Sequence, residues 1–151
     1  MNTLIRHRSI FAADDYAGEQ FLIRAALKGC DSPNPLYFFG NGQELVAALE
    51  SLLSQGQTAD LPCLILLDIK MPVMDGWEAM ERIKGNPKLR DIPIVLLTNS
   101  SASEDSDRGF YLGAARYITK PSDLKGLAEE MRALRNYWGE PPSTPWRGDF
   151  G

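Results

Sequence analysis

The residue best placed to do chemistry in this chain is Asp68, which ends a strongly apolar run. Residues 64–67 read Leu-Ile-Leu-Leu, Asp68 follows directly, and Pro72 and Gly76 lie in the turn beyond it. Such a run is typical of a strand that is buried on both faces of a parallel sheet. The carboxyl ends of parallel strands form the crevice in which open α/β sheets bind their ligands. Asp68 is therefore predicted to be a site residue and not a surface charge.

Three further apolar runs end in polar side chains that could act together with Asp68. The acidic pair Asp14 and Asp15 follows residues 10–13, Thr98 follows residues 94–97, and Lys120 follows residues 116–119. Asp68 and Thr98 are 30 residues apart, and Thr98 and Lys120 are 22 residues apart. Each interval corresponds to about one strand and one helix of a βαβ succession. The four strand ends are therefore expected to converge on one pocket.

The side chains in that pocket suit phosphoryl transfer. Clustered carboxylates repel one another, so the pocket is expected to bind a hard divalent cation with oxygen ligands, in practice Mg²⁺. With the metal bound, the Asp68 carboxylate can act as a nucleophile toward a phosphoryl group. The ammonium of Lys120 can stabilise the transferring group, and the hydroxyl of Thr98 can hydrogen-bond to one of its oxygens.

The elements that must position these residues alternate regularly between strand and helix. Strands are predicted near residues 8–13, 35–39, 63–68, 92–98 and 115–119, and helices near residues 17–29, 42–54, 76–85, 102–113 and 122–137. The second and fifth of these helices carry apolar residues at helical spacing. Strict alternation predicts an α/β fold with a doubly wound, five-stranded parallel sheet in the flavodoxin-like strand order 2-1-3-4-5.

In this order and spacing, the motifs resemble the receiver domain of two-component response regulators over roughly residues 8–136. They are the acidic pair, the motif Asp-x-x-Met-Pro-x-Met-Asp-Gly that runs from Asp68 to Gly76, the Thr after the fourth strand, and Lys-Pro at positions 120–121. The resemblance implies a receiver fold, with Asp68 as the phosphorylated residue. It therefore agrees with the chemistry that the residue types suggest.

The resemblance also implies roles for individual residues. Asp15, Asp68 and the backbone carbonyl of Lys70 would ligate Mg²⁺, and Asp14 would act through a water molecule. Thr98 and Tyr117 would form the pair that switches when Asp68 is phosphorylated. Asn99, directly after Thr98, is bulkier than the residue that many receivers carry there, and it is expected to narrow access to Asp68.

Other segments are similar to the small response regulators of cyanobacterial and bacterial phytochromes. They are Phe21-Leu22-Ile23 in the first predicted helix, Gly85-Asn86-Pro87 after the third, Leu97-Thr98-Asn99-Ser100-Ser101, and the pair Tyr137-Trp138. This similarity implies a sensor histidine kinase as phosphodonor, with a bacteriophytochrome as one candidate. It also implies a homodimer built on the fourth helix, the fifth strand and the fifth helix.

Length and composition fit one domain with a sizeable core. The chain has 151 residues, is 44% hydrophobic and carries a net charge of −4, without the basic excess that nucleic-acid binding usually requires. Residues 1–137 are predicted to form the receiver domain and residues 138–151 a Pro- and Gly-rich tail, with output through protein contacts. Cys30 and Cys63 are expected to be reduced thiols, and no run reaches the length of a membrane span. These features predict a cytoplasmic protein without nucleic-acid or membrane partners.

Two other functions remain open from the sequence. A haloacid-dehalogenase-like phosphatase also uses a strand-end aspartate, but it normally has a second acid two residues later, where this chain has Lys70. A phosphorylation-independent interaction module would keep the fold and lose the site, which the set of acidic residues, Thr98 and Lys120 argues against. The protein is expected to be a signalling protein that modifies only itself, and not an enzyme in the ordinary sense.

The fourth helix and the tail are the predicted output region. Residues 101–104 read as a capping box, but Gly109 lies mid-helix at a cost of about 1 kcal/mol relative to Ala, so this helix is expected to be marginal. The spacing of Met131, Leu134 and Trp138 suggests more apolar surface than one sheet needs. A homodimer with the tail against its interface, anchored by aromatic residues of the tail at positions 146 and 150, is the resulting prediction.

Overall fold

The predicted doubly wound sheet is confirmed by the computed structural model, which describes residues 7–99 and 102–139. Within these residues five parallel strands form one sheet in the order β2-β1-β3-β4-β5. The strands are β1 (Ile10–Ala13), β2 (Leu36–Phe39), β3 (Leu64–Leu67), β4 (Ile94–Thr98) and β5 (Arg116–Thr119). All five predicted strands are therefore present.

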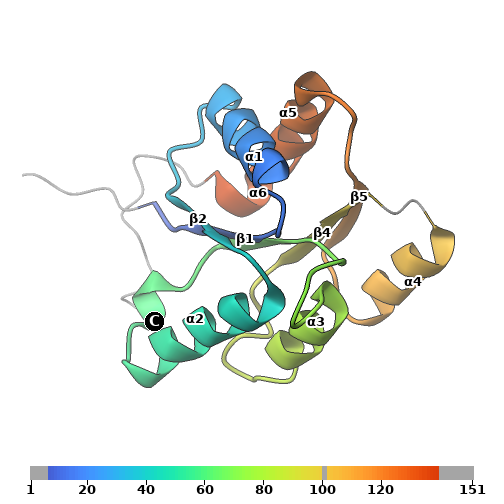
Figure 1. The fold of residues 1–151 in the computed structure, drawn as a ribbon. Coiled ribbons are helices and arrows are strands. Elements are labelled where there is room, and N and C mark those ends of the chain that lie inside the picture. The colour runs from blue at the N-terminus through green and yellow to red at the C-terminus, as the bar shows by residue number, and fades with distance from the viewer. Residues whose placement is uncertain (1–6, 100–101, 140–151) are drawn as a thin grey trace, which may run out of the picture.

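The helices lie on both faces of the sheet (Figure 1). The helices are α1 (Ala17–Gly29), α2 (Gly42–Ser54), α3 (Gly76–Lys84), α4 (Ser103–Tyr111), α5 (Leu124–Ala133) and α6 (Arg135–Trp138), with a short 3₁₀ turn η1 at Thr58–Asp60. Helices α1, α5 and α6 cover one face, and α2, α3 and α4 cover the other. None of the helices in the described part of the chain is long and apolar enough to cross a membrane.

Two apolar cores result from the alternation of side chains along the buried strands. In β3, Ile65 and Leu67 join the core under α2 and α3, whereas Leu64 and Leu66 join the core under α1 and α5. Cys30 and Cys63 are buried free thiols in the second core, as predicted. The central strands are thus held from both sides, which fixes the positions of the residues at their carboxyl ends.

Side chains cap three of the helices that begin near this edge of the sheet. Asn41 accepts from the N–H of Glu44 at the start of α2, Asp75 caps α3 in the same way, and Asp123 caps α5. The capping box predicted at residues 101–104 begins outside the described residues, and α4 starts at Ser103 after Ala102. Among the described residues of α4, Gly109 alone is buried.

Gly109 is the residue through which α4 packs closely against the sheet. A Cβ at this position would lie 2.7 Å from Leu96 Cδ1 and 3.4 Å from Tyr117 Cδ2, so a larger residue would force the Leu96 side chain to shift. The mid-helix glycine that the sequence marks as a weakness is therefore also the point at which α4 contacts β4 and β5. Arg108 adds a second contact, with its guanidinium 4.5 Å from the centroid of the Trp77 ring.

The last two helices, α5 and α6, contradict one prediction. The predicted fifth helix is divided at Leu134 into α5 and α6, and Met131, Leu134 and Trp138 are only 0%, 0% and 2% exposed. The indole N–H of Trp138 donates to the Met131 carbonyl at 2.9 Å. These side chains fill the domain's own core, so the inference that they form surplus apolar surface for a dimer is wrong. Residues 140–151 lie outside the described residues, and the anchoring of the tail stays a prediction.

Gly76 packs closely against the backbone at Asp68 and Ile69. Its N–H donates to the Ile69 carbonyl at 2.7 Å, and a Cβ would lie 2.2 Å from the Asp68 carbonyl oxygen. Gly76→Ala should lower the free energy of unfolding by about 3 kcal/mol or more, because backbone atoms must move to make room. Chemical denaturation measures this change.

Gly29→Ala is the matched control, since a Cβ there meets nothing within 4 Å at the end of α1. It should be neutral or stabilise the protein by about 0.5 to 1 kcal/mol. Equal effects of the two substitutions would contradict the close packing at Gly76.

Candidate functional site

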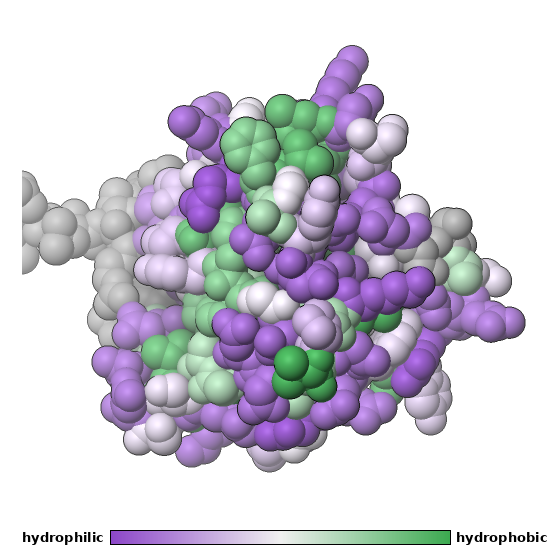
Figure 2. All heavy atoms as spheres, in the orientation of Figure 1, coloured by the Kyte–Doolittle hydropathy of each residue, from purple (hydrophilic) through white to green (hydrophobic). Residues whose placement is uncertain are grey.

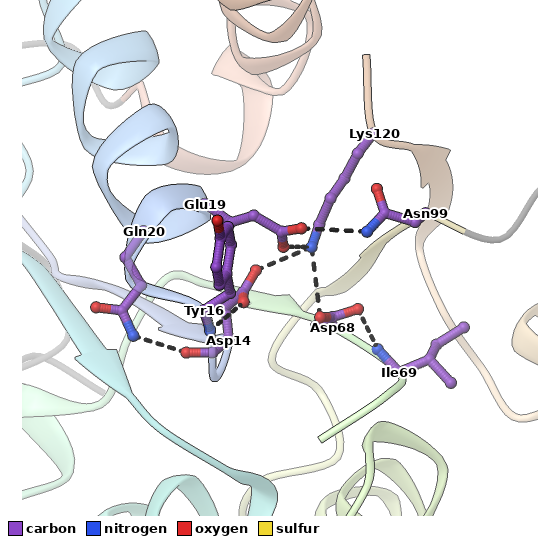
Figure 3. Close-up of polar contacts among 8 residues, drawn as sticks. All are labelled: Asp14, Tyr16, Glu19, Gln20, Asp68, Ile69, Asn99 and Lys120. Atoms are coloured by element: carbon purple, nitrogen blue, oxygen red, sulfur yellow. Dashed lines mark hydrogen bonds and ion pairs between the residues drawn. The ribbon is translucent and has the colours of Figure 1, made fainter. Parts of the chain in front are cut away.

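The carboxyl ends of four strands meet at one pocket, as the sequence predicts. Asp14 follows β1, Asp68 follows β3, Thr98 ends β4 and Lys120 follows β5. The Lys120 ammonium nitrogen lies 2.9 Å from Asp14 Oδ2 and 3.3 Å from Asp68 Oδ2 (Figure 3). Residues that are up to 106 positions apart in the sequence are therefore in direct contact.

Backbone groups fix the two buried aspartates. The N–H of Ile69 donates to Asp68 Oδ1 at 2.8 Å, so the other oxygen of Asp68 faces Lys120. The N–H of Tyr16 donates to Asp14 Oδ1 at 3.0 Å. Because each carboxylate is hydrogen-bonded by the turn after its own strand, both are oriented before any ligand arrives.

A cavity of about 300 Å³ opens over these groups. Its walls are formed by Asp15, Tyr16, Glu19, Asp68, Lys70, Thr98 and Asn99. Asp15 and Lys70 are exposed at its rim, whereas Asp68 and Thr98 are buried. The structure thus brings all the predicted pocket residues to one place, with Asp14 and Lys120 beneath the cavity and Asp15 and Lys70 at its mouth.

Glu19 belongs to the site, although the pattern of polar residues at strand ends does not predict it. It is the third residue of α1, and its carboxylate forms an ion pair with Lys120 and accepts from Asn99 Nδ2 at 3.1 Å. Single oxygens of Asp14, Glu19 and Asp68 lie within 4.8 Å of one another. The usable signal in the sequence was an acidic residue in the first turn of a helix that begins directly after the acidic pair.

The two residues that were predicted to act as a switch, Thr98 and Tyr117, lie on two neighbouring strands. Thr98 at the end of β4 pairs in register with Thr119 of β5, and Tyr117 pairs with Leu96. Tyr117 is half-buried and lies against Gly109 of α4. Leu96 and Tyr117, on the strands that lead to Thr98 and Lys120, therefore both lie against α4 at Gly109.

Electrostatics in the pocket reflect crowded negative charge. Burial, together with a hydrogen bond to Glu19, raises the pKa of Asp14 from its ordinary value of 3.8 to about 7, although Lys120 opposes this rise. Burial also raises the pKa of Asp68, and Lys120 offsets part of that rise. For Glu19, burial is outweighed by hydrogen bonds with Asp14, Lys120 and Asn99, so its pKa is lowered.

Lys120 keeps its charge in this environment. Burial alone favours the neutral amine, but contacts with Glu19 and Asp14 outweigh it and raise the pKa of Lys120. One ammonium therefore faces several carboxylates. A divalent cation would add positive charge to this acidic group.

The oxygen-rich set fits a hard divalent metal ion. Carboxylate oxygens are the ligands that Mg²⁺ and Mn²⁺ accept readily, and Asp14, Glu19 and Asp68 offer one oxygen each within a small space. Asp15 and Lys70, which the sequence also selects, stand at the mouth of the same cavity. The site is therefore an acidic cluster that could bind a divalent metal.

Comparison with known proteins decides the family. The sequence matches the response regulator receiver domain over residues 10–132. The chain belongs to this family. This receiver is 32% identical to the response regulator Rcp1 of Synechocystis sp. over 138 residues, which cover 90% of this chain and 92% of Rcp1.

Solved structures agree with that assignment. The receiver superposes on the phosphorylated cyanobacterial phytochrome response regulator RcpA with a TM-score of 0.77, at 29% identity and covering 92% of this chain and 100% of RcpA. For the Mn²⁺-bound form of Rcp1 the TM-score is 0.71, at 31% identity and 91% and 99% coverage. The bacteriophytochrome response regulator AtBRR gives 0.70, at 28% identity and 90% and 98% coverage. This receiver is thus a phosphoacceptor response regulator, and the phosphatase alternative is not supported.

The raised pKa of Asp14 leads to a prediction on stability. Without metal, Asp14 is ionised in the unfolded chain above 3.8 but in the folded protein only above about 7. The stability that protonated Asp14 contributes is therefore present in full at low pH and is lost as the pH rises through 7. Asp14→Asn should raise the free energy of unfolding by about 1 to 3 kcal/mol at pH 8, and by less as the pH falls toward 4.

Denaturation of the metal-free wild type and variant across this pH range measures the effect. Added Mg²⁺ should reduce the advantage of the variant, since the metal would stabilise the wild type more. A variant that is less stable than the wild type at pH 8 would contradict the prediction.

Proposed function

We propose that this receiver takes a phosphoryl group from a sensor histidine kinase onto Asp68 in a reaction that requires Mg²⁺. The main evidence is the position of the Asp68 carboxylate, which lines an open cavity. The Ile69 N–H donates to this carboxylate at 2.8 Å, and the Lys120 ammonium lies 3.3 Å from it. A carboxylate nucleophile, a fixed cation and access for a donor are the parts that phosphoryl transfer needs.

The proposed transfer has a simple balance of bonds. A carboxylate oxygen of Asp68 attacks the phosphorus of a phosphohistidine on the kinase. The new O–P bond forms as the N–P bond breaks, and the released imidazole takes up a proton from solvent. Lys120 offsets the negative charge of the transferring group, and Thr98 is the hydroxyl that we assign to one of its oxygens.

Mg²⁺ is the metal that we assign to the acidic cluster. Asp15, Asp68 and the Lys70 carbonyl are proposed as direct ligands, with Asp14 acting through water. Bound Mg²⁺ would supply positive charge for the phosphoryl oxygens. Three observations support this assignment. Carboxylate oxygens of Asp14, Glu19 and Asp68 lie close together, and the pKa of Asp14 is raised, as expected where negative charge is crowded. The related Rcp1 has a Mn²⁺-bound form.

The donor is proposed to dock over α1, beside the cavity mouth. Tyr16 and Phe21 are 65% and 69% exposed there, and Figure 2 shows an apolar area at the top of the molecule, over α1. The relatives RcpA and AtBRR are named as phytochrome and bacteriophytochrome response regulators, which supports a bacteriophytochrome as the kinase. We propose the cytoplasm as the compartment, since such kinases use ATP.

Output is proposed to occur through protein contacts, including a homodimer of α4, β5 and α5. Phe110 and Tyr111 of α4 are 55% and 89% exposed, and Leu124 of α5 is 43% exposed. This apolar surface supports an interface of two-fold symmetry. We also propose that the tail, residues 140–151, packs beside that interface. A truncation that tests this must start after Gly139, because Trp138 is in the core.

Phosphorylation of Asp68 is directly testable. With Mg²⁺ and acetyl phosphate, the wild type should gain one phosphoryl group by intact mass, and Asp68→Asn should gain none, because the nucleophile is lost. Chelation of Mg²⁺ should abolish labelling of the wild type. The exposed Asp91→Asn is the control and should label normally. Full labelling of Asp68→Asn, or labelling in excess chelator, would overturn the proposal.

Coupling between the pocket and the output surface gives a further prediction. Phosphorylated wild type should dimerise at least about 5-fold more tightly than the unmodified protein, and in Thr98→Ala this change should fall below about 2-fold. The variant should still be labelled at Asp68, because the hydroxyl reports the phosphoryl group and does not attack it. Sedimentation over a concentration series measures both proteins. If phosphorylation tightens the dimer of Thr98→Ala as much as that of the wild type, Thr98 is not part of the switch.

A further inference from the structure

Glu19 occupies the ammonium that an incoming phosphoryl group requires. Its Oε2 pairs with the Lys120 ammonium, and its Oε1 accepts from Asn99 Nδ2 at 3.1 Å (Figure 3). Asn99 directly follows Thr98 and lines the cavity over Asp68. One side chain of α1 therefore holds both Lys120 and the first residue of the segment that leads from β4 to α4.

Three carboxylates surround the ammonium of Lys120. It donates to Asp14 and Glu19 and forms an ion pair with Asp68 at 3.3 Å. A phosphoryl group on Asp68 therefore has to compete with Asp14 and Glu19 for this ammonium. Repulsion between the phosphoryl group and a carboxylate at the same ammonium acts in the same direction.

Glu19 is the partner best able to leave. The side chain of Asp14 is 2% exposed and that of Asp68 is 10% exposed, and backbone N–H groups hold both. The Glu19 side chain is longer, is 20% exposed and projects from the first turn of a helix. Its departure would free Asn99 as well as Lys120.

We infer that Glu19 is a positioning residue that holds Lys120 and Asn99 in the unphosphorylated form and is displaced by the phosphoryl group. This inference rests on the proposed function of Asp68. Glu19 then sets the balance between the two forms, because each contact that it makes must break when the phosphoryl group binds. Its release also frees Asn99, the residue directly after Thr98.

The negative charge of Glu19 acts in opposite directions on the two ligands of the site. It lies among the acidic groups, so it favours a divalent cation. It competes for Lys120 and repels anions, so it disfavours the phosphoryl group. A residue with only a structural role would weaken the binding of both ligands when it is replaced.

Glu19→Gln tests this difference in the full-length protein, because the amide keeps the size of the side chain and removes its charge. Calorimetric titration with Mg²⁺ alone should show about 3- to 10-fold weaker binding than in the wild type. Titration with fluoroberyllate, a phosphoryl analogue, at saturating Mg²⁺ should show about 3- to 10-fold tighter binding, because the competitor for Lys120 is lost.

Two variants accompany it. Asn99→Ala removes the contact between Asn99 and Glu19 and leaves the charge of Glu19, so it should tighten fluoroberyllate binding by a smaller factor and leave Mg²⁺ binding unchanged. Glu81→Gln, an exposed position on α3, makes the same charge change away from Lys120 and should alter neither titration by more than about 2-fold.

The outcomes are distinct. Weaker binding of both ligands by Glu19→Gln, or unchanged fluoroberyllate binding, would overturn the inference. Should Glu19→Gln fail to fold, tighter fluoroberyllate binding by Asn99→Ala still supports the inference, and unchanged or weaker binding overturns it. A wild type that binds no fluoroberyllate in the presence of Mg²⁺ would instead overturn the proposed function, and the inference with it.

Discussion

A single buried ammonium holds the carboxyl edge of this sheet together. Lys120 contacts Asp14 and Asp68 across β1, β3 and β5, and without it several carboxylates would face one another in a space of low polarity. The site remains acidic even so, since the pKa of Asp14 rises to about 7. The folded protein thus concentrates negative charge at one place. A divalent cation could neutralise part of this charge.

That arrangement depends on close packing of the backbone around it. Gly76 lets the start of α3 lie against the carbonyl of Asp68, and the strands beneath are held by cores on both faces. On the α4 side, Gly109 lies against Leu96 and Tyr117, and Arg108 stacks on Trp77. The Asp68 side of the pocket is therefore held by close backbone packing, and the α4 side is held in part by these side-chain contacts.

The sequence was sufficient for the fold and for most of the site because both depend on short patterns. Buried parallel strands read as apolar runs, and their carboxyl ends must lie at one edge, so Asp14, Asp68, Thr98 and Lys120 could be brought together from spacing alone. Glu19 could not be found in this way, because its reach depends on the start and rotation of α1. Periodicity also cannot distinguish an apolar face that meets its own domain from one that meets a partner, which is why the burial of Trp138 was not foreseen.

The contacts of Lys120 also indicate how an arriving anion would rearrange the pocket. Asp14 and Glu19 accept from the ammonium and Asp68 forms an ion pair with it, so a new acceptor would compete with groups already in place. Asp14 and Asp68 are bound by backbone N–H groups of their own turns, and an exchange at either of them would disturb a strand end. Glu19 is attached to a helix surface and to Asn99, so an exchange there disturbs only side chains. The least costly rearrangement of the charges would therefore be the one that separates Glu19 from Lys120 and Asn99.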